Sequence, residues 1–196
     1  MHSSIRRSPV PPSAPRLRTI NDGLALRVAF RLPVVERLGT QHDRAAFSCG
    51  VPDLDAYLHR QAGQDAKRKV AAPFVLVDQT GQILGYYTLS AYSILLKDLP
   101  EQTARKVPKY PILPSTLLGR LAISLEHQRQ KLGQFLLMDA LRRSLKNTSE
   151  VASVGVVVDA YNDAAQSFYR RHEFIPFSEH PNRLFISMRT IEKVFI

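Results

Sequence analysis

The sequence predicts one α/β domain in which helices pack on a mixed β-sheet. Along residues 27–196, apolar and β-branched runs alternate with segments whose leucines recur at helical spacing. The 196 residues are enough to bury one core without metal or disulfides. The single cysteine, Cys49, excludes a disulfide framework and suits the reducing cytoplasm. No apolar run reaches the roughly 18 residues of a membrane span, so we expect a cytoplasmic protein.

Residues 1–26 are predicted to be a disordered basic tail outside the domain. They hold four of the 13 prolines, all between residues 9 and 15, among serines and four arginines. Proline removes backbone donors and disfavours helix at the residue before it. The tail also lacks the apolar core of a signal peptide. We therefore assign the domain to residues 27–196.

The first half of the domain is expected to form strands around one helix. The helix opens at Pro52 and ends in a basic cluster, Lys67, Arg68 and Lys69, which also complements the helix dipole. Strands are expected at Val28–Leu38, at Phe74–Val77 and at Ile83–Tyr92, the last two forming a hairpin. Residues 97–114, rich in proline and cations, are expected to be an exposed excursion with one short helix.

The second half repeats the alternation of strand and helix. The helix at Gly133–Lys146 has leucines on one stripe, and Asn162 is a suitable N-cap for a helix that ends at Arg171. The remaining apolar runs predict strands at Thr116–Leu125, Val151–Asp159, Phe174–Phe177 and Leu184–Met188. This order of elements predicts the mixed sheet.

The connection between the strand at 116–125 and the next helix could bind phosphate. A loop that enters a helix presents free amides and the positive end of the dipole. Gly133 permits close approach of the backbone, and Arg129 and Lys131 add positive charge. An ordinary connection with its basic residues in water explains the same segment, so both interpretations stay open from these residues.

Six segments in order resemble the GCN5-related N-acetyltransferases (GNATs), and within them the bacterial toxins that acetylate aminoacyl-tRNA. The similarity covers about residues 30–195. It is carried by Phe47–Leu54, Leu84–Tyr87, Leu118–Ile123, the loop from Gln128 to Gly133, Leu136–Leu141, and Val158–Ala160 with Ala164–Tyr169.

The resemblance implies a fold, a cofactor and a site. It implies a mixed sheet of six to seven strands with a splayed strand pair, flanked by about four helices. It implies acetyl-CoA as cofactor, and Tyr169 as the general acid that protonates the leaving thiolate; a core tyrosine is the alternative for that residue. The implied acetyl-CoA residues are Leu121, Ala122, Ile123, Gln128, Arg129, Gln130, Lys131, Leu132, Gly133, Gln134, Asn162 and Ala165.

The loop departs from the family pattern at two positions. Gln128 and Gly133 match, but Lys131 stands where the middle glycine is usual, and Arg129 where toxin relatives often have another. A Cβ there could block a pyrophosphate, whereas the added positive charge could compensate. Because both replacements introduce a cation, we favour compensation.

The charge balance favours a polyanionic partner. The formal net charge is +10, of which residues 1–26 supply +3. The histidines, such as His42, His127 and His172, are scattered; we interpret them as surface residues and expect no metal site. The basic residues assigned to tRNA are Arg60, Lys67, Arg68, Lys69, Arg105, Lys106, Arg120, Arg170 and Arg171.

Three functions remain in order of preference. The first is transfer of acetyl to the α-amino group of aminoacyl-tRNA, which blocks translation. The second is acetylation of a small-molecule or protein amine, and the third is a nucleic-acid-binding module without catalysis. The toxin resemblance further implies a ribbon-helix-helix antitoxin as partner and leaves a homodimer open.

Overall fold

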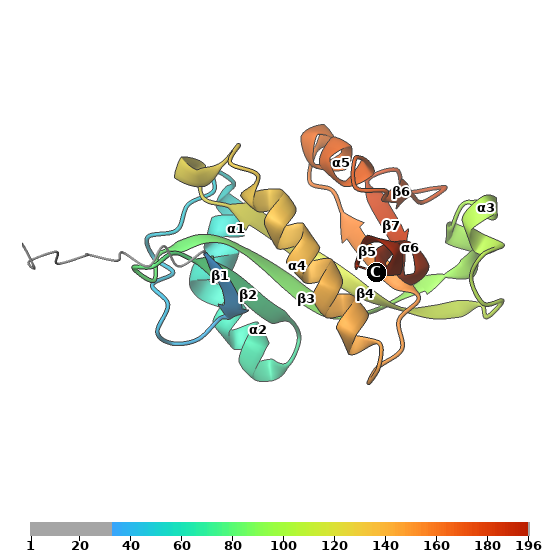
Figure 1. Ribbon diagram of the computed structural model, residues 1–196, viewed down its shortest axis with the longest axis horizontal. Coiled ribbons are helices and arrows are strands. Elements are labelled where there is room, and N and C mark those ends of the chain that lie inside the picture. Colours follow the sequence, from blue (N-terminus) through green and yellow to red (C-terminus); the bar gives the residue numbers. More distant parts are fainter. Residues whose placement is uncertain (1–32, 196) are drawn as a thin grey trace, which may run out of the picture. The chain divides into compact units, whose positions relative to one another are not determined.

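The computed structural model describes residues 33–195, which form a seven-stranded sheet with helices on both faces (Figure 1). The strand order is β1-β2-β3-β4-β5-β7-β6, with β4 and β5 parallel and the other pairs antiparallel. The predicted mixed α/β sheet is therefore confirmed. The predicted tail, residues 1–26, and residues 28–32 of the first predicted strand lie outside the described residues.

The elements follow the predicted order. The strands are β1 Val34–Arg37, β2 Ala72–Val77, β3 Ile83–Leu95, β4 Ile112–Ile123, β5 Gly155–Asp159, β6 Ile175–Pro176 and β7 Arg183–Ser187. The helices are α1 Pro52–Ala56, α2 Ala62–Arg68, α3 Glu101–Ala104, α4 Leu132–Asn147, α5 Asp163–Arg170 and α6 Met188–Phe195. A π-helical turn, Tyr57–Gln61, joins α1 to α2.

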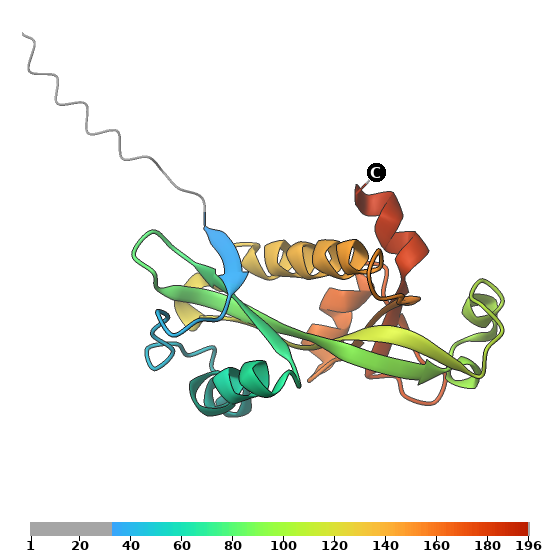
Figure 2. The same cartoon turned by 90° about the horizontal axis from the view of Figure 1, so that it is seen from below.

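Alternating side chains of the strands build a core on each face of the sheet. On one face, α4, α5 and α6 cover Leu118, Val156 and Val158. On the other face, the helical segment from α1 to α2 covers Val75 and Tyr86. Figure 2 shows α1 and α2 on one face, with α4 and α6 on the other. At the α3 end of the sheet, a third cluster contains Val157 and Phe185.

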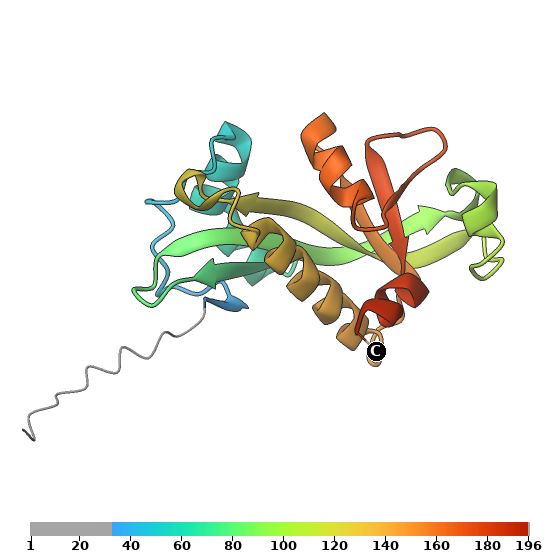
Figure 3. The ribbon, with the colours of Figure 1, turned by 45° about the horizontal axis from the view of Figure 1, so that its top comes forward.

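The hairpin of β3 and β4 is the longest structure in the sheet. Its strands have 13 and 12 residues, and α3 lies in the excursion at its far end (Figure 3). Strand β3 runs past the predicted end at Tyr92 to Leu95, and β4 begins at Ile112, inside the predicted excursion and before the predicted start at Thr116. The short helix predicted there is confirmed as α3.

The C-terminal helix α6 was missed in the sequence, which predicted a strand through Met188 and about four helices. Counting α1 to α2 as one helical segment, the described residues hold five. The strand ends at Ser187, whose Oγ accepts a hydrogen bond from the Thr190 amide at 3.1 Å and so caps the new helix. Ile191 is fully buried and anchors the helix on the core. The Ser187 cap was the sequence signal for this helix.

Two further boundaries were wrong. The strand predicted from Val151 begins only at Gly155, because residues 148–154 form the turn that leaves α4. The helix predicted from Pro52 is interrupted by the π-helical turn, which hydrophobic spacing alone does not reveal.

Candidate functional site

Strands β4 and β5 separate beyond Leu118 and leave a gap in the sheet. They pair only at residues 116–118 of β4, while β4 continues to Ile123 against β3. Gly119 is an extra residue in β4, because Thr88 pairs with Arg120 and Leu89 with Leu118. This bulge lies where the strands part, so the splayed pair implied by the resemblance is present.

The free edge of β4 presents backbone groups to this gap. The Ser124 amide donates to the Leu84 carbonyl at 2.9 Å, so the amide of Ser124 faces β3. Because amides alternate along a strand, those of Leu121 and Ile123 face the gap. The side chain of Ala122 points to the opposite face, into the α1–α2 cluster. Leu121 and Ile123 are thus placed to bond an extended ligand through their main chain.

The loop after β4 is tied down by its own polar groups. The Gln128 side-chain amide donates to the carbonyls of Cys49 at 3.0 Å and Ile123 at 3.2 Å. The Gln130 side chain donates to the Glu126 carbonyl at 3.2 Å. Both glutamine side chains therefore hold the loop in place, and the backbone groups of the loop are available to bind a ligand.

Arg129 and Lys131 keep the backbone shape that glycine would favour. Their φ angles are 63° and 62°, in the left-handed region, and both side chains are exposed. The residues that replace the family's glycines therefore preserve the turn and place two cations beside the start of α4. The left-handed conformation costs a non-glycine residue roughly 1–2 kcal/mol.

The N-terminus of α4 fits a phosphate group. Along α4, Phe135 is the first residue whose amide has an acceptor; it donates to the Lys131 carbonyl at 3.1 Å. Within residues 33–195 the amides of Leu132, Gly133 and Gln134 have no acceptor, and no side chain caps the helix. A Cβ on Gly133 would lie 3.9 Å from both Ile123 and Phe168, so this turn faces the gap between β4 and α5. Free amides, helix dipole and flanking cations suit a pyrophosphate.

Helix α5 borders the other side of the gap. The Asn162 side chain accepts from the Ala165 amide at 2.9 Å, which confirms the predicted N-cap. That amide is therefore already bonded within the protein. Asn162 keeps its side-chain NH2 as a donor, whereas Ala165 can contact a ligand through its methyl group.

Tyr169 is a buried phenol in the core beside the strands that part. It is 7% exposed and packs on Phe168 and Phe174, with ring centroids 5.2 and 5.4 Å away. It belongs to the same cluster as Leu118 and Val158. Among the described residues no partner bonds its hydroxyl, and burial raises the pKa of Tyr169 above its usual value. The hydroxyl stays protonated at neutral pH and can donate a proton.

Arg120 connects the bulge of β4 to the helical segment before it. Its guanidinium lies 3.6 Å from the centre of the Tyr57 ring, a cation–π contact. Tyr57 is 3% exposed and belongs to the π-helical turn. Burial, together with neighbouring Asp65, raises the pKa of Tyr57 to about 12. No carboxylate within residues 33–195 pairs with Arg120. Sequence reasoning missed Tyr57.

The other predicted tRNA residues do not form one patch. Arg60 is exposed on the π-helical turn, and Lys67, Arg68 and Lys69 are exposed where α2 ends. Arg105 and Lys106 follow α3 at the far end of the long hairpin, where Arg105 pairs with Glu101. Arg170 and Arg171 are exposed at the end of α5.

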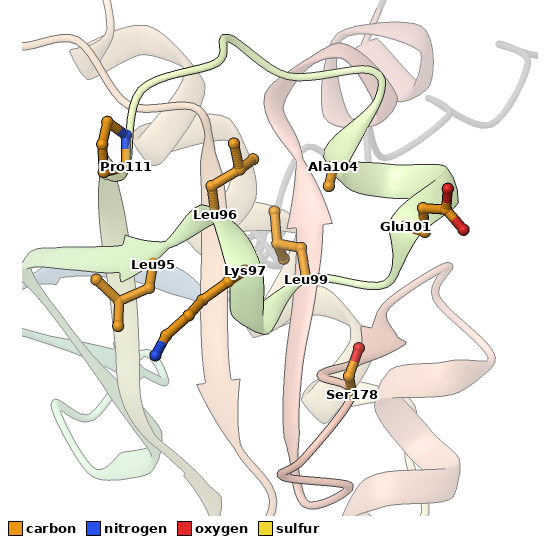
Figure 4. Close-up of a pocket in the computed structure, with 8 residues that line it drawn as sticks. All are labelled: Leu95, Leu96, Lys97, Leu99, Glu101, Ala104, Pro111 and Ser178. Atoms are coloured by element: carbon orange, nitrogen blue, oxygen red, sulfur yellow. The ribbon is translucent and has the colours of Figure 1, made fainter.

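A hollow of about 810 Å³ lies beneath α3, away from the gap (Figure 4). Its walls include Leu95, Leu96, Leu99 and Pro111, with Lys97 and Glu101 as the charged residues. Seven residues of β4 separate Ile112 from Gly119, about 23 Å of strand. Its lining contains no tyrosine, and it lies away from the free amides that begin α4.

The histidines do not gather into one site. Within residues 33–195 no group of three or more His, Cys, Asp or Glu side chains could hold a metal ion. The interpretation of His42 as a surface residue was wrong. It is buried, accepts from the Gly39 amide at 2.9 Å and lies 2.7 Å from Glu36.

No described helix is long and apolar enough to cross a membrane.

Comparison with known proteins identifies a relative similar in sequence and solved structures with a similar fold. A tRNA-acetylating toxin of Mycobacterium tuberculosis (strain ATCC 25618 / H37Rv) is 31% identical over 153 residues, covering 78% of this chain and 90% of the relative. The structure of AtaT complexed with acetyl-methionyl-tRNAfMet has a TM-score of 0.78 and 31% identity, covering 84% of this chain and 99% of that chain.

A second structure of AtaT contains a cofactor and part of an antitoxin. It is a mutant of the toxin AtaT bound to the C-terminus of the antitoxin AtaR and acetyl-CoA. Its TM-score is 0.71 at 28% identity, covering 83% of this chain and 98% of that chain. The family model described as "Acetyltransferase (GNAT) family" matches residues 40–174. The splayed strands, the uncapped helix after them and this match together show that the chain belongs to the GNAT family of acetyltransferases.

Proposed function

We propose that this protein transfers the acetyl group of acetyl-CoA to the α-amino group of aminoacyl-tRNA, and thereby blocks translation. The carrying observation is the combination of groups at the gap: a buried protonated phenol, an unpaired guanidinium and an uncapped helix N-terminus. The similar proteins are a tRNA-acetylating toxin and a toxin solved with acetyl-methionyl-tRNA. The cytoplasm, where charged tRNA is used, is the compartment that the proposal implies.

The residues around the gap fit acetyl-CoA, which supplies an activated acetyl thioester when bound. The amides that begin α4, with Arg129 and Lys131, would hold the pyrophosphate. The main chain of Leu121 and Ile123 would bond the extended arm and polarise the acetyl carbonyl. Gln128 would keep this loop in place.

The strands that border the gap offer no free carboxylate as general base among the described residues, which agrees with an aminoacyl ester as acceptor. The carboxylate at the end of β5, Asp159, is already bound to Arg183 at 2.7 and 3.1 Å. A free α-amine titrates near 7.7–8.0, and an ester lowers this value further. Much of the acceptor is therefore neutral at pH 7 and can attack without a base. Tyr169 would then donate its proton to the departing sulfur as the C–S bond breaks, and the proton that the attacking nitrogen loses on forming the C–N bond would pass to water and restore the phenol.

Labelled acetyl-CoA, incubated with charged tRNA or with tRNA stripped of its amino acids, tests the proposal. We expect label only in charged tRNA, and a kcat lower by roughly 100-fold in Tyr169→Phe, because a general acid contributes that much or more. Tyr110→Phe is the matched control, since Tyr110 is exposed in the excursion. Transfer to free lysine or to proteins, with none to charged tRNA, would instead support a small-molecule or protein amine as substrate.

The proposal extends to protein partners. The similar toxin AtaT binds the C-terminus of its antitoxin AtaR. We infer that a ribbon-helix-helix antitoxin neutralises this protein in the same manner, and that two copies of the chain form a homodimer. Light scattering of the purified protein, alone and with the product of an adjacent gene, tests both expectations.

A further inference from the structure

A basic hollow lies where the end of α5 meets α6 and the excursion after α3. Its volume is about 740 Å³. Figures 1 and 3 show α3 at one end of the sheet, with α5 and α6 on the side of α4 that faces that end. The hollow is lined by four cations from separate segments: Lys106 after α3, Arg170 at the end of α5, and Arg189 and Lys193 on α6. Of these four residues, Lys106 and Arg170 were assigned to tRNA from the sequence, and Arg189 and Lys193 were not.

The four cations have no ion-pair partner among the described residues. By contrast, Arg105, Arg143 and Arg183 each pair with a carboxylate within residues 33–195. Glu173 is the one carboxylate among the residues that line the hollow, so the lining has a net charge of +3. Like charges held together repel one another, and a bound polyanion relieves this repulsion.

The floor and rim of the hollow suit a sugar-phosphate chain better than a bare ion. Phe174, Ile175 and Phe185 give an apolar floor. Thr103, Ser187 and Thr190 also line the hollow, the hydroxyls of the last two bonded to each other at 2.8 Å, and hydroxyls and cations are the usual ligands of nucleic-acid phosphates.

The position of the hollow relates it to the proposed reaction. Arg170 follows Tyr169 directly, so their Cα atoms are about 3.8 Å apart. Val154 lines the hollow, and Val158 marks the point where β5 leaves β4. Four residues of strand span about 13 Å. A stacked nucleic-acid strand rises about 3.4 Å per nucleotide, so the hollow lies roughly four nucleotides from the gap.

We propose that this hollow binds backbone phosphates of the RNA substrate, upstream of the nucleotide that carries the amino acid. The proposal rests on the proposed function, because it takes the aminoacyl end to lie at the gap. Arg189 and Lys193 are then RNA-binding residues, and α6 is part of the substrate surface.

The double variant Arg189→Gln/Lys193→Gln tests this assignment. Its matched control is Arg142→Gln/Lys146→Gln, which removes two exposed cations from α4. We expect the KM for charged tRNA to rise about ten-fold in the double variant, with kcat unchanged. The slope of log affinity against log salt concentration should fall in magnitude by roughly 1–2, since each lost phosphate contact removes about one unit. The control should change little.

A shortened substrate separates this surface from the catalytic gap. An aminoacylated adenosine carries no upstream phosphate for the hollow, so its KM should be the same in wild type and double variant. An unchanged KM of the double variant for full-length charged tRNA would overturn the proposal. Loss of poly-glutamate binding in the double variant, with tRNA binding unchanged, would also overturn it, because this result would assign the hollow to an acidic protein segment. If the wild type acetylates neither substrate, the proposed function fails; filter binding of uncharged tRNA to both variants then decides the hollow by itself.

Discussion

Arg129 and Lys131 show how single residues can depart from a family pattern while the backbone follows it. Both adopt positive φ, and both carry an exposed cation next to free amides. In our proposal, the backbone strain that glycine would avoid is offset by the attraction of these cations to a bound phosphate. The backbone strain lowers the stability of the protein without a ligand, whereas the positive charge strengthens the binding of a phosphate ligand. Substitutions can therefore separate the two effects.

The pair Lys131→Gly and Lys131→Gln separates them. Glycine relieves the left-handed strain and should raise the free energy of unfolding by up to about 1 kcal/mol. Glutamine keeps the strain and should leave that free energy unchanged. Both remove the cation and should weaken acetyl-CoA binding several-fold. Thermal denaturation and calorimetric titration measure the two quantities. Acetyl-CoA affinity that stays the same in both variants would show that the charge does not compensate.

The pH dependence of the reaction follows from Tyr169. Burial raises the pKa of Tyr169, so its acid form persists through the neutral range and above pH 10. The rate should therefore rise with pH as the acceptor amine loses its proton, near or below 7.7–8.0, and then stay level to about pH 10. Initial rates measured between pH 6 and 10 check this. A fall in rate between pH 8 and 9 would show that another group is the acid.

At the scale of elements, α4 depends on a buried polar cluster for its position. Asp139 is 8% exposed; it accepts from the Tyr87 hydroxyl at 2.6 Å and from Arg143 at 2.7 Å. Arg143 also donates to the Val35 carbonyl at 3.1 Å. The cluster joins α4 to β3 and β1. Because the free amides lie at the start of this helix, its placement sets where a phosphate can bind.

Removal of Asp139 should therefore be costly. Asp139→Ala leaves Arg143 and the Tyr87 hydroxyl without their buried partner, and we expect a loss of roughly 3 kcal/mol in unfolding free energy. Arg142→Ala removes a weaker contact to the same carboxylate, at 3.4 Å on an exposed side chain, and should cost under about 0.5 kcal/mol. Urea denaturation measures both. Equal losses in the two variants would mean that the buried cluster contributes little.

Element types were largely predictable, and their ends were less so. The leucine stripe predicted α4 and the Asn162 cap predicted α5, because each is a local signal. Helix α6 was missed because its eight residues directly follow an apolar strand and only two of them, Met188 and Ile191, are buried, which is too few to establish a helical period. The π-helical turn and the bulge at Gly119 depend on contacts between distant segments, such as Arg120 on Tyr57, which spacing does not encode.

For the whole molecule, four buried tyrosines link stability to alkaline pH. Burial raises the pKa of Tyr57, Tyr86, Tyr87 and Tyr169 above the value of an unfolded chain. The stability that these protonated phenols provide is complete below about pH 10 and is lost as pH rises toward their folded values.

Unfolding should therefore become steeply easier above about pH 10. The absorbance of phenolate, recorded with circular dichroism as pH is raised, checks this. We expect the buried tyrosines to ionise together with the loss of structure. Ionisation of all tyrosines at pH 10 with full circular dichroism retained would contradict it.

The net charge of the molecule could be predicted from the sequence, but the distribution of the charged side chains over the surface could not. A net charge of +10 predicted a polyanionic partner, and Arg120 and Arg170 proved to lie beside the gap and at the basic hollow. Arg189 and Lys193 were not assigned, because only the missed helix α6 brings them to that hollow. Site residues in recognisable motifs were accessible to sequence reasoning, whereas surface residues assembled by packing were not.

The bonds between the β4–α4 loop and the segment before α1 make two binding events interdependent. The Leu125 amide donates to the Ser48 carbonyl at 2.9 Å, and Gln128 bonds the Cys49 carbonyl. A ligand that shifts this loop also shifts the segment that leads to Tyr57 and Arg120, so the position of one binding surface depends on that of the other. Acetyl-CoA should then tighten tRNA binding, and reciprocity requires tRNA to tighten acetyl-CoA by the same factor. Ser48 and Cys49, which contact neither ligand in our proposal, would thus set the cooperativity of the reaction.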